Sequence, residues 1–141
     1  MMLAPVPWPQ LAIRLGCALL VGAIIGFERE GQGKPAGLRT HILVSLGSAL
    51  MVAVSIQTGA AQDSIDSFSR IVQGVITGVG FIGAGTIFHS DRVHGLTSAA
   101  AIWLSSGLGI AAACGLWQLS ILSALATWFI LRVLDRLERF L

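Results

Sequence analysis

Five long apolar segments, separated by short polar ones, dominate the pattern of this chain. They run over residues 11–27, 42–56, 71–88, 96–113 and 116–131. Each is close to the roughly 20 residues that a helix needs to cross the hydrocarbon core of a bilayer. One helix over residues 96–131 would be about 54 Å long, and a bilayer core is only about 30 Å thick. Gly115 is therefore expected to mark a tight turn between two spans.

The apolar residues do not alternate with polar ones as they would in barrel strands. A backbone in lipid must satisfy its hydrogen bonds within a helix or a closed barrel. The pattern therefore predicts an all-α integral membrane protein with a bundle of five transmembrane helices. Composition supports this class, because 55% of the residues are hydrophobic, 11% are charged and mean hydropathy is +0.82. A soluble domain of 141 residues could not bury so much apolar surface.

The basic residues predict the orientation. Seven of the nine Lys and Arg residues follow the first, third or fifth span, which end on one side of the membrane. By the positive-inside rule this side is cytoplasmic, so the N-terminus lies outside and the C-terminus in the cytoplasm. We expect a short outer segment (1–10), a membrane domain (11–131) and a basic cytoplasmic helix end (132–141).

The stretch GVGFIGAG, residues 78–85, contains the G-x-G-x-x-G spacing that often marks a dinucleotide site. Such a site needs a preceding strand and an acidic residue about 20 positions further on. No strand pattern precedes these glycines, and Asp91 follows Gly83 by only eight residues. We therefore set the nucleotide interpretation aside.

Small residues four positions apart predict close helix packing instead, because helices in lipid associate where their backbones can approach. The positions expected to serve helix packing or a helix break are Gly22, Gly26, Gly74, Gly78, Gly80, Gly83, Gly85, Ser105 and Gly109. Residues 78–85 hold more glycines than one packing stripe requires. The third helix is therefore expected to pack closely there, or to kink or break, and broken helices at membrane depth often line a substrate site.

Two polar loops, residues 27–41 and 89–95, fall on the predicted cytoplasmic side. If the bundle is compact, they form one polar floor beneath the helices. The candidate functional cluster in this floor is Glu28, Arg29, Arg39, Thr40, His41, Asp91 and Arg92. Glu28 directly follows an apolar run, where an inward-pointing ionisable group is costly and usually functional. The alternative is an ordinary solvated loop at a helix end.

The carboxylates of Glu28, Glu30 and Asp91 are also weak candidates for metal ligands, because magnesium prefers hard oxygen atoms and often uses only one or two carboxylates. The histidines lack the spacing of a zinc site. No cofactor is expected, and magnesium at these carboxylates is the one possibility left open. No nucleophile, base and orienting group occur in a plausible set, so we do not expect an enzyme, and nucleic acid is not an expected partner.

A faint internal repeat has an offset of 58 residues. Residues 37–50 match residues 95–108 at 5 of 14 positions, and upstream of them Gly22 corresponds to Gly80 and Gly26 to Ala84. An offset of two spans preserves orientation, so the repeat would be parallel. Chance similarity in so apolar a sequence is the alternative.

Four motifs in order carry a family resemblance. They are GFERE, KPAGLRTHILVSLGSAL, RIVQGVITGVGFIGAGTIF and VHGLTSAAAIWLSSGLGIA. In order and spacing the chain resembles the membrane domain of the MgtC/SapB family over residues 11–131. The family's pattern falls on Gly26, Glu28, Arg29, Gly37, Leu38, Arg39, Thr40, Gly78, Gly80, Phe81, Gly83, Ala84, Gly85, Gly95, Leu96, Thr97 and Trp103.

The resemblance implies a multi-pass protein of the bacterial inner membrane, surrounded by lipids and linked to magnesium homeostasis and low-magnesium stress. It also implies regulation of another membrane protein, such as the F-type ATP synthase. Members of the virulence type carry a further soluble domain, which is not expected here.

Two functions stay open. One is a regulatory protein that associates with itself or with a membrane partner. The other is a transporter or channel for magnesium or another cation, with Glu28 at the inner mouth of a path along the third helix. The shortage of charged residues within the spans favours the first.

Overall fold

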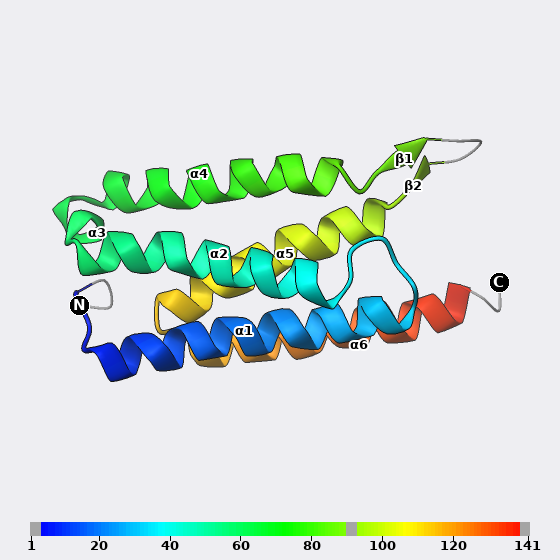
Figure 1. Ribbon diagram of the computed structural model, residues 1–141, viewed down its shortest axis with the longest axis horizontal. Helices are drawn as coiled ribbons and strands as arrows, with labels where there is room; N and C mark the ends of the chain where they lie inside the picture. Colours follow the sequence, from blue (N-terminus) through cyan, green and yellow to red (C-terminus); the bar gives the residue numbers. More distant parts are fainter. Residues whose placement is uncertain (1–3, 90–92, 139–141) are drawn as a thin grey trace.

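The computed structural model describes residues 4–89 and 93–138 (Figure 1). The elements in chain order are α1 (Trp8–Gly31), α2 (Leu38–Gln57), α3 (Ala60–Asp63), α4 (Ile65–Ala84), β1 (Phe88–His89), β2 (Val93–His94), α5 (Leu96–Ala113) and α6 (Trp117–Glu138). The strands form a small antiparallel hairpin. The helices α1, α2, α4, α5 and α6 are each long and apolar enough to cross a membrane. The predicted bundle of five transmembrane helices is confirmed, and its orientation stays a prediction.

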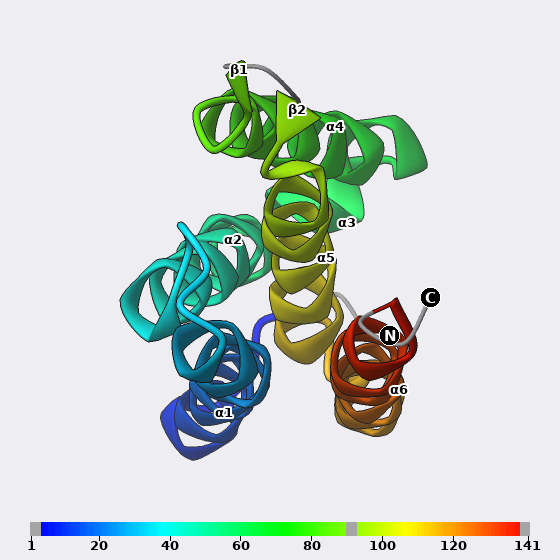
Figure 2. The same cartoon turned by 90° about the vertical axis from the view of Figure 1, so that its right-hand side faces the viewer.

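α5 is the central helix of the bundle. Viewed along the bundle, it is surrounded by α1, α2, α4 and α6, and it packs on all four (Figure 2). In its membrane-crossing stretch 50% of the residues are buried, against 11% in α4. α4 lies at the edge, packed on α5 and more lightly on α2. The bundle therefore leaves most of α4 uncovered.

α1 is longer than the sequence pattern predicts. It includes residues 8–10, which were expected in the outer segment, and residues 28–31, which were expected in a polar loop. Pro9 fits the first turn, because N–H groups there have no partner within the helix anyway. The extra turn at the other end places Glu28 and Arg29 on a helix rather than in a loop.

α4 corrects the expected third span. The helix covers Ile65–Ala84 rather than residues 71–88, so the prediction is wrong at both ends. Its start is fixed by Ser64, whose hydroxyl oxygen accepts a hydrogen bond from the N–H of Ser67. Apolar patterning missed this polar first turn. All of α4 is described, and it is one continuous helix without a break at its glycines.

The glycines of α1 and α5 lie where two backbones meet. A Cβ atom added to Gly22 would come within 2.8 Å of the carbonyl oxygen of His41, and one added to Gly26 within 2.7 Å of the Cα atom of Leu38. A Cβ atom on Gly109 would collide with the carbonyl group of Ser45. The absence of a side chain at these positions therefore permits α2 to approach both α1 and α5.

The glycines of α4 behave differently. A Cβ atom added to Gly74, Gly78 or Gly80 would meet nothing within 4 Å, so these glycines serve no close contact inside the described protein. Gly83 faces Ala99 on α5 at ordinary contact distance, 3.6 Å to its Cβ atom. Gly85 follows the end of the helix.

The turn predicted at Gly115 is confirmed. This glycine has a φ of +81°, and the N–H groups of Gly115 and Leu116 donate to carbonyl oxygens in the last turn of α5. Arg14 of α1 donates a further hydrogen bond to the carbonyl oxygen of Ala113, at 2.8 Å. A cation thus lies at the negative end of the α5 dipole.

Candidate functional site

The loop after α1 and the strands β1 and β2, which belong to the two predicted polar segments, lie at the same end of the bundle as the end of α6 (Figure 1). Five consecutive crossings require this arrangement. Asp91 and Arg92 lie outside the described residues, so their part in a polar floor stays a prediction. The described charges at this end come mainly from α1, the loop after it, and α6.

Glu28 lies near the end of α1 and is 9% exposed. Arg132 Nη1 donates to its Oε2 atom at 2.9 Å, and Gln32 Nε2 donates to its Oε1 atom at 2.9 Å. The guanidinium group of Arg132 also lies over the ring of Trp128, 5.5 Å from its centroid. Each oxygen of this buried carboxylate therefore has a donor, as burial of a charge requires.

Arg29, the next residue, is 2% exposed. Its Nη2 atom donates to the hydroxyl oxygen of Ser98 on α5 at 2.7 Å, and its Nη1 atom reaches Gln32 Oε1 at 3.5 Å. Its Nε atom has no hydrogen-bond partner among the described residues. The carboxylates that act on its charge are those of Asp135 and Glu28. Gln32 thus bridges two neighbouring side chains of opposite charge.

A third connection joins the loop after α1 to α6, where Lys34 Nζ lies 3.4 Å from Asp135 Oδ1. We call the connected residues the end cluster: Glu28, Arg29, Gln32, Lys34, Ser98, Arg132 and Asp135. Two cavities, of about 250 and 270 Å³, border it, and Asp135 lines both. The end cluster holds three cations and two carboxylates, so it presents both signs of charge to these cavities.

The other described candidate residues are not joined to the end cluster by the hydrogen bonds that define it. Glu30 Oε2 accepts the N–H of Leu38 at 2.7 Å and so caps the start of α2. Arg39 is exposed and Thr40 half-buried. His41 is fully buried, and its Nδ1 atom lies 2.8 Å from the carbonyl oxygen of Gly37. Of the described candidates, Glu28 and Arg29 belong to the end cluster, whereas Glu30 and His41 are bonded to the start of α2.

The metal interpretation gains no support from this geometry. Glu28 and Glu30 bind different partners, a side chain of α6 and the backbone of α2. Asp91 is outside the described residues. Within residues 4–89 and 93–138, no three His, Cys, Asp or Glu side chains come together in a group that could hold a metal ion.

Serine hydroxyls account for most polar groups inside the bundle. Ser45 donates to the carbonyl oxygen of Ala18 and Ser120 to that of Leu108, each at 2.8 Å. These two hydroxyls therefore donate to backbone carbonyl oxygens of neighbouring helices. Besides Arg29 Nε, the buried atoms Ser105 Oγ and His41 Nε2 have no hydrogen-bond partner in the described part of the chain.

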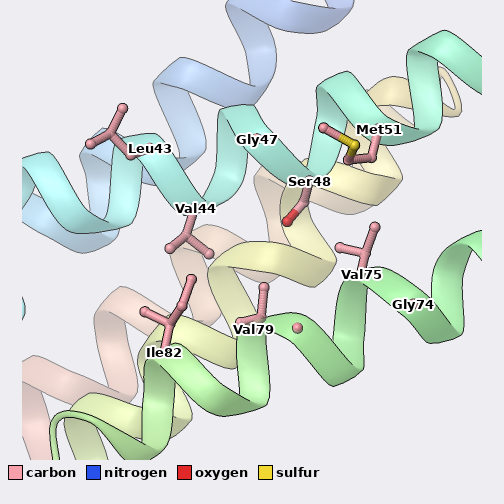
Figure 3. Close-up of a pocket in the computed structure, with 10 residues that line it drawn as sticks. Leu43, Val44, Gly47, Ser48, Met51, Gly74, Val75, Val79 and Ile82 are labelled. Carbon is pink, nitrogen blue, oxygen red and sulfur yellow. The ribbon is translucent and has the colours of Figure 1, made fainter.

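An apolar groove of about 410 Å³ runs between α2 and α4 (Figure 3). Gly74 and Gly78 line it from α4, with apolar side chains such as Val44 and Ile82 around them. Ser48 supplies the one polar side chain among its lining residues, and its hydroxyl is bonded to Ser106. Apart from this one hydroxyl, the lining side chains of the groove offer no oxygen atom that could replace the hydration shell of a cation.

A protein-family model described as the MgtC family matches residues 15–140. The chain belongs to the MgtC family.

Three relatives show how much of each protein is shared. Protein SrpB of Synechococcus elongatus is 46% identical over 94% of this chain and 79% of its own length. The putative magnesium transporter YhiD of Escherichia coli K12 is 41% identical over 91% of this chain, and protein MgtC of Salmonella typhimurium LT2 is 42% identical over 75% of it. The chain spans 62% of YhiD and 43% of MgtC. No solved structure matches it.

Sequence reasoning missed several residues of the site in this MgtC-family chain. Gln32, Ser98 and Asp135 were not singled out, and Arg132 was assigned only to a basic tail. A signal was available for α6, because Arg132 and Asp135 follow an apolar run directly, three residues apart on one helix face. Their contacts with α1 could be found only from the packing of the helices.

Proposed function

We propose that this MgtC-family protein is a magnesium-related regulator in the bacterial inner membrane, and that the end cluster is the site through which it acts on another membrane protein. The observation that carries the proposal is the burial of Glu28 and Arg29, which are 9% and 2% exposed at the end of a membrane-crossing helix. Buried ion pairs contribute little net stability. Charges kept at such a position therefore favour a functional role.

The link to magnesium rests on the family and on YhiD, which is named a putative magnesium transporter. The F-type ATP synthase is the partner that the family resemblance implies. A cluster with three cations and two carboxylates suits recognition of a charged protein surface, because some of its ion pairs can be exchanged for pairs with the partner. The hydrogen-bonded hydroxyls of Ser45 and Ser120 and the apolar lining of the groove favour regulation over transport.

The test is complementation of growth at low magnesium in a bacterial strain that lacks its own family member. Glu28→Gln removes one charge from the end cluster, and we expect loss of complementation at an unchanged protein level in the membrane. Glu30→Gln is the matched control, because it removes the same charge two residues away and keeps an oxygen to accept the N–H of Leu38. Normal growth with the Glu28 variant would refute the role of this site.

The partner is tested separately in inverted membrane vesicles. ATP-driven proton pumping should be lower when the wild-type protein is present than when it is absent, and Glu28→Gln should abolish the difference. Equal pumping in all three preparations would exclude the ATP synthase as the partner, while the growth assay would still report on the site.

Transport is the second candidate, and one observation favours it. Ser105 Oγ and His41 Nε2 are buried polar atoms that have no hydrogen-bond partner among the described residues, as groups along an ion path would be. Purified protein in liposomes should conduct no magnesium, sodium or protons above the empty-liposome rate if the protein is a regulator. Flux that Ser105→Ala or His41→Gln reduces would replace the regulatory proposal with transport.

A further inference from the structure

A continuous stripe of polar and small residues runs along the uncovered face of α4. Its positions follow one another at intervals of four and three: Asp66, Arg70, Gln73, Thr77, Gly80 and Ala84. All of them are exposed. This spacing places them on one side of the helix, and alternating steps of four and three are the pattern of a helix that packs along another at a small angle. We call this set the α4 stripe.

Gln73 is the largest uncharged polar residue of the α4 stripe. It lies about 12 Å along the helix from Ile65, at 1.5 Å per residue, in the apolar part of a membrane-crossing helix. Its amide group makes no hydrogen bond to the residues that the structure describes. A carboxamide facing hydrocarbon is costly, whereas two such groups on adjacent helices satisfy each other.

The surface near Gln73 has little side-chain bulk, so a second helix can pack closely on it. A Cβ atom added to Gly80 would meet nothing within 4 Å, so a partner's backbone can approach there. The internal repeat points the same way, because Gly80 corresponds to Gly22. Gly22 is covered by α2, and Gly80 is exposed. The first half of the chain thus has a helix against this position, and the second half does not.

We infer that the α4 stripe is the contact surface for a second copy of this chain, with the two α4 helices parallel and related by a two-fold axis. Copies inserted in the same orientation bring α4 helices together parallel. The stripe is self-complementary, since a carboxamide is both donor and acceptor. Identical residues lie level in such a pair, so Asp66 of one copy can meet Arg70 of the other diagonally, one turn further along the helix. This inference does not depend on the proposed function.

Cysteine cross-linking in membranes tests the contact. In a Cys17→Ala, Cys114→Ala background, Thr77→Cys should give a disulfide-linked product of twice the monomer mass under mild oxidation. Leu20→Cys is the matched control, because it also faces outward from the middle of a membrane-crossing helix, 53% exposed, but on α1. Equal cross-linking at both positions, or none at Thr77→Cys, would overturn the inference.

Charge exchange distinguishes a second copy from a different partner. Asp66→Arg and Arg70→Asp should each lower the dimer fraction measured by single-molecule photobleaching in lipid nanodiscs, and the double variant should restore it. Both side chains are exposed, so the fold of one copy should tolerate the changes. Gln73→Leu should raise the dimer Kd roughly tenfold, as loss of an interhelical hydrogen bond predicts. A monomer at every concentration, or no rescue by the double variant, would refute self-association through α4.

Discussion

Ser48 and Ser106 face each other across the contact between α2 and α5, with their hydroxyl oxygens 2.8 Å apart. They are separated by 58 residues, the offset of the faint repeat in the sequence. The hydrogen bond therefore joins equivalent positions of the two halves of the chain. Such a contact is what two similar units make when they meet around an approximate two-fold axis, so it is a structural counterpart of the repeat.

The contribution of each serine of this pair to stability should depend on the presence of the other hydroxyl. Ser48→Ala or Ser106→Ala leaves one buried hydroxyl without its partner, and we expect the free energy of unfolding to fall by about 1 kcal/mol. The double variant should lose less than the sum of the single losses, because no hydroxyl is then left unpaired. Reversible unfolding in mixed detergent micelles measures all three variants. Additive losses would show that the two side chains do not interact.

Gly109 and Gly107 offer a matched pair on the same helix. A methyl group at Gly109 would collide with the carbonyl group of Ser45, whereas one at Gly107 would meet nothing within 4 Å. Gly109→Ala should therefore destabilise the protein by about 1–3 kcal/mol or more, as overpacking does. Gly107→Ala should have no such cost and gain slightly in helix propensity. The free energy of unfolding decides this, and similar values for the two variants would contradict the close approach of α2 and α5.

Arg14 should stabilise the end of α5. Its Nη1 atom donates to the carbonyl oxygen of Ala113 at 2.8 Å, and its charge lies at the negative end of the helix dipole. Arg14→Gln should lower the free energy of unfolding by about 1 kcal/mol, and Arg14→Lys by less, because the charge remains. A loss with Lys as large as the loss with Gln would assign the effect to the hydrogen bond alone.

Variants of the ion pair between Glu28 and Arg132 should distinguish a role in function from a role in stability. Arg132→Met leaves a buried carboxylate with Gln32 as its other donor. This should cost about 1–3 kcal/mol, since Arg132 is partly exposed and water screens part of the pair. Adding Glu28→Met should recover most of that stability, yet low-magnesium complementation should stay lost. Recovery of growth in the double variant would indicate that the pair serves folding alone.

The packing role of glycine was predictable in kind but not in place. Spacing alone marked Gly22, Gly26 and Gly109 in the same way as Gly74 and Gly78. The first three lie where α2 touches its neighbours, and the last two line an open groove. A stripe of small residues indicates that some helix can approach. It does not say whether that helix belongs to the same chain.

The candidate site was predictable in part for a similar reason. Glu28 and Arg29 stand out because they directly follow an apolar run, where an ionisable group that points inward is costly. Glu30 carries the same local signal, yet it turns to the start of α2. Neighbouring positions on a helix point in different directions, so only the packing of α1 against α5 and α6 separates a site residue from a helix cap.

The amino-acid sequence by itself determined the membrane class, the five spans, the turn at Gly115 and the family, because these depend on local hydrophobicity, chain length and motif order. The tertiary structure alone decided which helix is central, that α4 is unbroken and uncovered, and that Arg132 and Asp135 complete the site of Glu28 and Arg29. These features depend on which helix faces meet. In lipid such contacts arise from shape and from a few hydrogen bonds between residues far apart in the chain, which a hydrophobic pattern does not record.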